Sequence, residues 1–158
     1  MAHGHREPDL GERSLVVVFA APVASYLMHF GADAGFRTVL VEPDATRRDD
    51  AAVPELDKSF VDATADVVVA DHDRPELGAM LRDALALPAR WIGVIGSIRH
   101  TAPHIEALRD LGVGEDDIAR VHRPIGLNIG SQSPAEIAIA TLAGLIAGRN
   151  GRPGGFSW

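Results

Sequence analysis

The chain has 158 residues, of which 46% are hydrophobic and 23% charged, and it carries a formal net charge of -7 with no cysteine. This length and apolar content suffice for one ordinary domain, and the negative charge argues against nucleic acid or an anionic membrane as a partner. Without cysteine, disulfides, thiolate metal sites and a thiolate nucleophile are excluded.

We divide the chain into a flexible N-terminal arm at 1–13, one domain at 14–150 and a loose C-terminal tail at 151–158. The arm is polar and contains glycine and proline, and its histidines, His3 and His5, form no convincing metal site. It lacks the apolar core of a secretory signal, and no apolar run approaches membrane-spanning length. We therefore expect a cytoplasmic protein without a membrane segment.

The domain begins with the pattern of a βαβ unit. A continuous apolar run at 14–19 is typical of a strand covered on both faces, a helix is predicted over 22–34, and a second strand over 36–41. In a dinucleotide-binding fold, the acid at the end of the second strand hydrogen-bonds the adenosine ribose. Glu42 is the candidate for this role, with Asp44 as its substitute.

The turn after the first strand departs from the nucleotide-binding fingerprint. Residues 19–24 read FAAPVA where G-x-G-x-x-G/A is usual, so only the last small residue agrees. Side chains at both glycine positions and the missing N–H of a proline weaken the phosphate grip. Two interpretations stay open: a Rossmann-like unit that keeps its shape without a cofactor, or a cofactor bound at Ala20, Ala21, Pro22 and Val23.

Three polar residues, Asp71, His72 and Asp73, follow the buried strand predicted over 66–70 and precede a helix predicted over 75–87. Ligand groups in open α/β sheets gather at the carboxyl ends of strands. His72 and Asp73 are therefore the candidates for catalysis, with the histidine as a general base or as part of a metal site. In the alternative interpretation, Asp71 or Asp73 caps the next helix and His72 faces solvent.

A further strand over 90–95 leads into Gly96 and Ser97, and then into a helix over 98–111. Glycine permits a close backbone approach here, and the serine can hydrogen-bond a ligand or cap the helix. His100 and His104 lie four residues apart on this helix and would share a face. Because the local sequence offers no third ligand, we interpret them as surface residues rather than a metal pair.

The last predicted strand, at 119–122, is preceded by a short helix near Ile118 and leads into a glycine-containing loop and a long helix. Ser133 as N-cap, a proline in the first helical position and Glu136 at capping-box spacing mark the start of this helix. Its predicted buried face consists of Ile137, Ile139, Leu142, Leu145 and Ile146.

The glycine-containing loop before this helix is the candidate anion site. Gly126 and Gly130 permit conformations or close approaches that a side chain would block, and the helix start behind them favours negative charge. We expect an opening for an anionic ligand between the loops at Gly96 and Gly126. Alternatively, the glycines simply turn the chain between strand and helix.

Four segments resemble the C-terminal Rossmann domain of the xanthine dehydrogenase accessory family, also called the XdhC/CoxI family. They are WIGVIGSIRH at 91–100, RVHRPIGLNIGSQSPAEIAIATLAGLIAGR at 120–149, VVVADHD at 67–73 and SLVVVFAAPVASYL at 14–27. The resemblance implies a three-layer α/β/α domain of the α/β class with a mainly parallel, doubly wound sheet. It also implies a role in maturing molybdenum hydroxylases, by binding molybdenum cofactor, assisting its sulfuration and delivering it to the apo-enzyme.

The positions that match the family motifs are His72, Asp73, Gly96, Ser97, Pro124, Gly126, Leu127, Gly130, Pro134 and Glu136. The chain departs from the family at three places: the family usually has a glycine-rich first turn, an arginine after the IGS serine and an aspartate before the second glycine of the PIGL segment. Here stand FAA at 19–21, Ile98 and Asn128. Full-length members carry an N-terminal domain as well, so a separate subunit of that type is expected to supply it, unless the chain is a divergent paralogue with only the binding function.

Three functional hypotheses follow. The first is an accessory protein that binds molybdenum cofactor in its pterin dinucleotide form and has a molybdenum hydroxylase apo-enzyme as partner. The second is an NAD(P)-dependent oxidoreductase, for which Glu42 favours NAD, although no tyrosine–lysine pair supports hydride transfer. The third is a scaffold that forms a homodimer or docks on a partner without any ligand.

Overall fold

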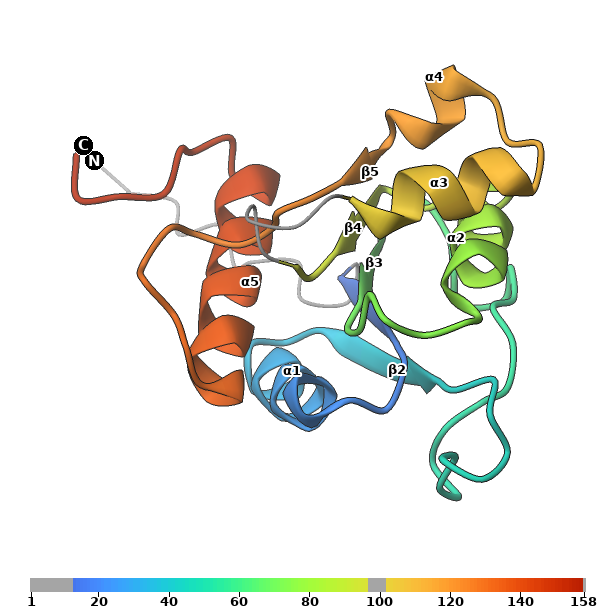
Figure 1. Cartoon of the computed structure of the whole chain (residues 1–158). Helices are drawn as coiled ribbons and strands as arrows, with labels where there is room; N and C mark the ends of the chain where they lie inside the picture. Colours follow the sequence, from blue (N-terminus) through green and yellow to red (C-terminus); the bar gives the residue numbers. More distant parts are fainter. Residues whose placement is uncertain (1–12, 97–101, 158) are drawn as a thin grey trace.

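The structure is a computed structural model that describes residues 13–96 and 102–157. Its centre is one sheet in which all neighbouring strands pair in parallel, in the order β2-β1-β3-β4-β5 (Figure 1). The strands are β1 (Ser14–Val18), β2 (Arg37–Val41), β3 (Ala65–Val69), β4 (Trp91–Val94) and β5 (Val121–His122).

Helices cover both faces of this sheet. They are α1 (Pro22–Asp33), α2 (Leu77–Leu85), α3 (Pro103–Asp110), α4 (Glu115–Ile118) and α5 (Pro134–Arg149). Helices α1 and α5 pack together on one face, and α2 and α3 pack together on the other (Figure 1). The predicted three-layer α/β/α class with a parallel, doubly wound sheet is therefore confirmed.

Strand β1 is apolar on both faces because both faces are covered. All of its residues are buried. Val16 and Val18 belong to the core beneath α2 and α3, whereas Leu15 and Val17 belong to the core beneath α1 and α5. The continuous valine-rich pattern at 14–18 is what a central parallel strand requires.

The strand order reverses at β1. From this strand the chain passes through α1 to β2 on one side, and it later returns to β3 on the other side. In open α/β sheets, ligands bind outside the carboxyl ends of the strands at such a switch point. The carboxyl ends of β1 and β3 are thus where a ligand site is expected.

Two helices begin later than the sequence indicated. Helix α2 starts at Leu77 rather than at 75, after a turn at 75–76, and the preceding Arg74 forms ion pairs with the buried Glu42 and the partly exposed Glu76. Helix α3 starts at Pro103 rather than at 98. The predictions for residues 1–12, for 97–101 with Ser97 and His100, and for Trp158 lie outside the described residues.

Helix α5 begins as predicted. Its N-cap is Ser133, whose Oγ accepts a hydrogen bond from the Glu136 N–H at 3.2 Å. The reciprocal bond differs from a regular capping box, because Glu136 Oε1 accepts from the N–H of Gln132 at 3.3 Å, one residue earlier than expected.

Replacing Ser133 by alanine should lower the free energy of unfolding by about 1 kcal/mol, because an N–H of the first turn loses its acceptor. Denaturant unfolding of the variant measures this change as a lower midpoint at an unchanged slope. Ser131→Ala, in the loop before the helix, is the matched control and should leave the midpoint unchanged. Equal midpoints for the two variants would show that the cap contributes nothing.

The buried face of α5 was predicted only in part. Leu142 and Leu145 are buried, but Ile139 is 51% exposed, and Ala138 and Thr141 are buried in its place. These four residues follow the spacing of one helical face, which Ile139 leaves by about 100°, and Ala140 is buried outside that face. No helix within residues 13–96 and 102–157 has the length and apolar character needed to cross a bilayer.

A buried carboxylate ties the end of α5 to the sheet. Asp66 is fully buried; its Oδ1 accepts from Arg90 Nε at 2.8 Å and its Oδ2 accepts from Arg149 Nε at 3.0 Å. Arg149 also donates to the Thr64 carbonyl. Two guanidinium groups therefore share one carboxylate, and this group of three side chains carries a net positive charge.

Candidate functional site

A cavity lies at the switch point of the sheet. Its volume is about 320 Å³, and four segments form it: the turn after β1 with the start of α1, the end of β3, the end of β4 and the first turn of α5. We call it the switch-point cavity. Its lining residues are Ala21, Pro22, Val23, Ala70, Asp71, His72, Ile95, Pro134 and Ile137.

The turn after β1 keeps the conformation of a glycine turn without the glycine. Phe19 has φ +79°, in the left-handed region that an L side chain adopts at a cost of roughly 1–2 kcal/mol. Its ring is fully buried in the core on the α2 side, 4.4 Å from the Arg74 guanidinium carbon. Burial of this ring offsets the backbone strain, so the chain forms the tight turn with phenylalanine where the fingerprint has its first glycine.

Glu42 lies fully buried beside this turn and is fully engaged. Its two oxygens accept from the two Nη atoms of Arg74 at 2.7 and 2.8 Å, and from the N–H groups of Ala20 at 3.1 Å and Asp44 at 2.9 Å. Burial alone raises the pKa of the Glu42 carboxyl, but these donors and the charge of Arg74 outweigh it and hold the pKa below its usual value.

This arrangement differs from the ribose-binding role expected for Glu42. A ribose acid must present a free oxygen to the ligand, whereas Arg74 and two backbone N–H groups occupy both oxygens here. Its expected substitute, Asp44, accepts hydrogen bonds from the N–H and hydroxyl of Thr46 and holds a surface turn. Glu42 therefore has no oxygen left for a ribose hydroxyl.

His72 has a defined tautomer at the mouth of the switch-point cavity. Its Nδ1 lies 3.2 Å from the Ile95 carbonyl oxygen, which only accepts, so Nδ1 carries a hydrogen, and in the neutral imidazole Nε2 is the acceptor. Nε2 lies 3.6 Å from Oδ1 of the strongly exposed Asp73. Such an imidazole can accept a hydrogen bond or a proton from a bound molecule.

The alternative interpretation of the three polar residues after β3 is wrong in one respect. Neither aspartate caps α2, whose N-cap is Glu76. Instead, Asp71 accepts from the N–H of Asp73 at 2.9 Å and holds the local turn. His72 is only partly exposed and faces the cavity rather than open solvent.

Among the residues that the structure describes, both bends expected to frame an opening, at Gly96 and Gly126, are closely packed by the protein's own atoms. A Cβ at Gly96 would lie 2.2 Å from Nε of Arg123, whose side chain fills this bend. Gly126 has φ +89°, and a Cβ there would lie 3.1 Å from the α5 backbone at Ala140 and Thr141. The glycine allows close packing of the loop on the helix, which fits the alternative that Gly126 turns the chain, and Gly126 and Leu127 also line a separate cavity beneath α5.

Two further loop residues expected to bind a cofactor also lie away from the switch-point cavity. The N–H of Leu127 donates to the Ala140 carbonyl at 3.0 Å. Gly130, at φ +69°, is exposed with open space around it. Ala20 lies next to the cavity, but its N–H is bonded to Glu42.

Five of the residues predicted from sequence therefore come together in one cavity: Ala21, Pro22, Val23, Asp71 and His72. Pro134, one of the positions that match the family motifs, lines it as well, whereas Ala70, Ile95 and Ile137 were not expected from the sequence. The signal that could have found them is the switch-point rule itself, because it gives greatest weight to the strand ends beside β1.

His104 is buried, which contradicts its interpretation as a surface residue. It is only 5% exposed, and burial together with the positive charge of Arg123 lowers its pKa below the usual value. Within residues 13–96 and 102–157, no three histidine or carboxylate side chains lie close enough to hold a metal ion.

Comparisons with known proteins agree with this fold. Uncharacterized protein YqeB of Escherichia coli (strain K12) is 38% identical over 86 residues, which are 54% of this chain and 15% of YqeB. A crystal structure described as a xanthine dehydrogenase from Bacillus halodurans has a TM-score of 0.67 and 23% identity, over 92% of this chain and 45% of that one. The chain thus spans less than half the length of either protein.

The family assignment comes from the XdhC Rossmann domain model, which matches residues 15–145. The match includes every strand after the first residue of β1 and most of α5. It confirms the resemblance carried by the segments at 14–27, 67–73, 91–100 and 120–149. The chain therefore belongs to the XdhC Rossmann domain family.

Proposed function

We propose that the chain is a binding module in molybdenum hydroxylase maturation that holds the pterin part of molybdenum cofactor in the switch-point cavity. One observation carries the proposal: residues expected from sequence to bind a cofactor, on two separate segments, line a single cavity at the switch point of an XdhC-family domain. Bound molybdenum cofactor would be cargo, passed to an apo-enzyme of the xanthine dehydrogenase or CO dehydrogenase type.

The size of the cavity supports one ring system rather than a whole dinucleotide. Its volume of about 320 Å³ lies at the lower end of the range for small-molecule sites, roughly 300–1,000 Å³. At the end of β2, where the second half of a dinucleotide would lie, Glu42 has no oxygen free for a ribose because Arg74 and two backbone N–H groups occupy both. The dinucleotide form expected from the sequence therefore has less support than the pterin alone.

The lining residues suit a pterin chemically. Val23 and Ile137 supply apolar contact for a planar ring, while His72 Nε2 and Asp71 are acceptors for its N–H groups. The N–H of Val23 has no acceptor among the described residues, so it is available to a phosphate oxygen at the start of α1. Pro22 provides no such donor, which leaves a weaker phosphate grip than a glycine-rich turn.

Co-purification of pterin tests this proposal. The chain is produced in cells that make molybdenum cofactor, and pterin released from the purified protein is measured by fluorescence after oxidation. We expect a stoichiometric fraction in the wild type and a loss of about tenfold or more in Ala21→Leu, because the added carbons enter the cavity; tenfold corresponds to about 1.4 kcal/mol of binding free energy.

The matched control is Ala32→Leu, on the exposed side of α1 far from the cavity. It should retain the wild-type amount of pterin. Absence of pterin from the wild type, or equal retention by Ala21→Leu, would refute the assignment. A thermal shift with NAD or NADP would instead favour the oxidoreductase hypothesis.

A further inference from the structure

A second and larger cavity lies on the same face of the sheet, beneath the C-terminal half of α5. Its volume is about 470 Å³, and it shares no lining residue with the switch-point cavity. We call it the α5 cavity. The residues that matter for its chemistry are Arg90, Trp91, His122, Gly144 and Gly148.

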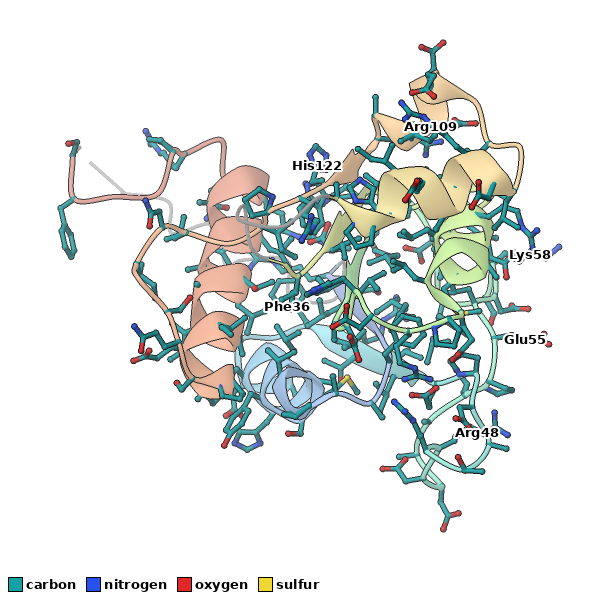
Figure 2. The ribbon with its side chains drawn as sticks, in the orientation of Figure 1. Phe36, Arg48, Glu55, Lys58, Arg109 and His122 are labelled. Atoms are coloured by element: carbon teal, nitrogen blue, oxygen red, sulfur yellow. The ribbon has the colours of Figure 1, made fainter. Side chains whose placement is uncertain are left out.

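One wall of the α5 cavity is aromatic. The rings of Trp91 and His122 stack with centroids 5.3 Å apart and planes 6° from parallel. The Trp91 ring lies over Gly93, where a Cβ would be only 2.2 Å from Cη2 of Trp91, so a larger residue at 93 would prevent this stacking. Gly93 pairs with His122 between β4 and β5, which brings the two rings together. Figure 2 shows His122 at the β5 edge of the sheet. A flat aromatic wall favours a planar ring as ligand.

The rim of the cavity is positively charged. Arg90 lines it and shares the buried carboxylate of Asp66 with Arg149, which leaves one positive charge uncompensated within this group. The Arg90 side chain is 30% exposed, so its charge is accessible to a ligand. Guanidinium groups bind carboxylates and phosphates through paired hydrogen bonds.

The opposite wall is helix backbone. Gly144 packs against Gly126, since a Cβ at position 144 would lie 3.3 Å from the Gly126 Cα. Around Gly148 there is open space, with no atom within 4 Å of a Cβ placed there. Glycine at 144 thus allows the loop to pack closely on α5, and glycine at 148 leaves space at the lining of the cavity that a side chain would occupy.

We propose that the α5 cavity binds a small planar aromatic anion, such as a heteroaromatic carboxylate, with its ring against the Trp91–His122 wall and its acid group at Arg90. The site is separate from the one assigned to pterin. Its ligand would be recognised by ring shape and by one negative charge.

Quenching of Trp91 fluorescence by quinoline-2-carboxylate tests the proposal. Trp158→Phe removes the other tryptophan of the chain, so the signal comes from the cavity wall alone. We expect saturable quenching, with binding about tenfold or more weaker for quinoline-2-carboxamide, which has the same rings without the charge. In Arg90→Met the preference for the acid over the amide should disappear.

Gly148→Leu, made in the same background, is the blocking variant. The leucine has room to extend into the α5 cavity and also favours the helix, so the protein should fold and saturable quenching should be lost. Gly114→Leu is the matched control, because that glycine also has open space but lies at the start of α4. It should bind as the parent does.

Unsaturable quenching, equal binding of acid and amide, or full binding by Gly148→Leu would each overturn the proposal. Ala21→Leu keeps this test separate from the pterin assignment. It should abolish pterin retention and leave the quenching curve unchanged, and loss of quenching in that variant would count against two independent sites.

Discussion

Replacing Arg74 by methionine is expected to lower the free energy of unfolding by about 3–5 kcal/mol, because it leaves the buried Glu42 carboxylate without its cation. Arg74 is 5% exposed, donates to both oxygens of that carboxylate and lies over the Phe19 ring. Because methionine fills much of the same volume, the decrease in unfolding free energy comes mainly from loss of the guanidinium charge. Denaturant unfolding at neutral pH measures it.

The pH dependence identifies the cause. In the wild type the pKa of Glu42 is held below its ordinary value of 4.5, so this group stabilises the fold above that pH and the contribution is lost as pH falls through the folded pKa. Without Arg74, burial raises the folded pKa, and stability should instead decline as pH rises. The difference in unfolding free energy between the variant and the wild type should therefore increase from pH 4 to pH 7.

Two variants check this interpretation of the Arg74 substitution. Adding Glu42→Gln to Arg74→Met should restore part of the stability, because an uncharged amide does not require a buried cation. Arg82→Met is the matched control, since Arg82 on α2 is half exposed and its ion pair with Asp83 is a surface one. A loss at Arg82 as large as that at Arg74 would contradict the role given to burial.

At Phe19, replacement by glycine is expected to be less damaging than replacement by alanine. Either change removes a fully buried ring, which costs about 3–5 kcal/mol. Glycine, however, adopts φ +79° without strain and should recover about 1 kcal/mol relative to alanine. Comparing unfolding free energies of the two variants measures this difference.

Phe36 provides the matched pair of substitutions. It is also buried, at 5% exposure, but it lacks a positive φ, and it lies immediately before β2 (Figure 2). There glycine should be worse than alanine, because it adds backbone freedom to the unfolded chain and relieves no strain in the folded one. The same order at both positions would show that the turn at Phe19 stores no backbone strain.

The sequence predicted the elements well because their signals are local. The valine-rich run of β1, the proline that opens α1 and the Ser133 cap of α5 each depend on a few neighbouring residues. Helix α2 was predicted two residues too long at each end, and the buried pair just before it joins Arg74 to Glu42, which lies 32 positions away. No local pattern reports such a contact.

The candidate site was predicted in part for the same reason. The segments at 21–23 and 71–72 follow strands that lie side by side, so their position at strand ends was enough to bring them together. A glycine, by contrast, shows that something approaches closely but does not show what it is. At Gly96 it is the Arg123 side chain, and at Gly126 it is the backbone of α5.

The anchoring of α5 is one-sided. Arg149 in its last turn reaches the buried Asp66, whereas the first turn is held at its cap by bonds near the surface. Local unfolding begins where few buried contacts hold the backbone, so we expect transient unfolding of this helix to be concentrated in its first turn. That turn carries Pro134 and Ile137, which form a wall of the switch-point cavity. A molecule can then enter past a briefly frayed helix end while the sheet below it stays rigid.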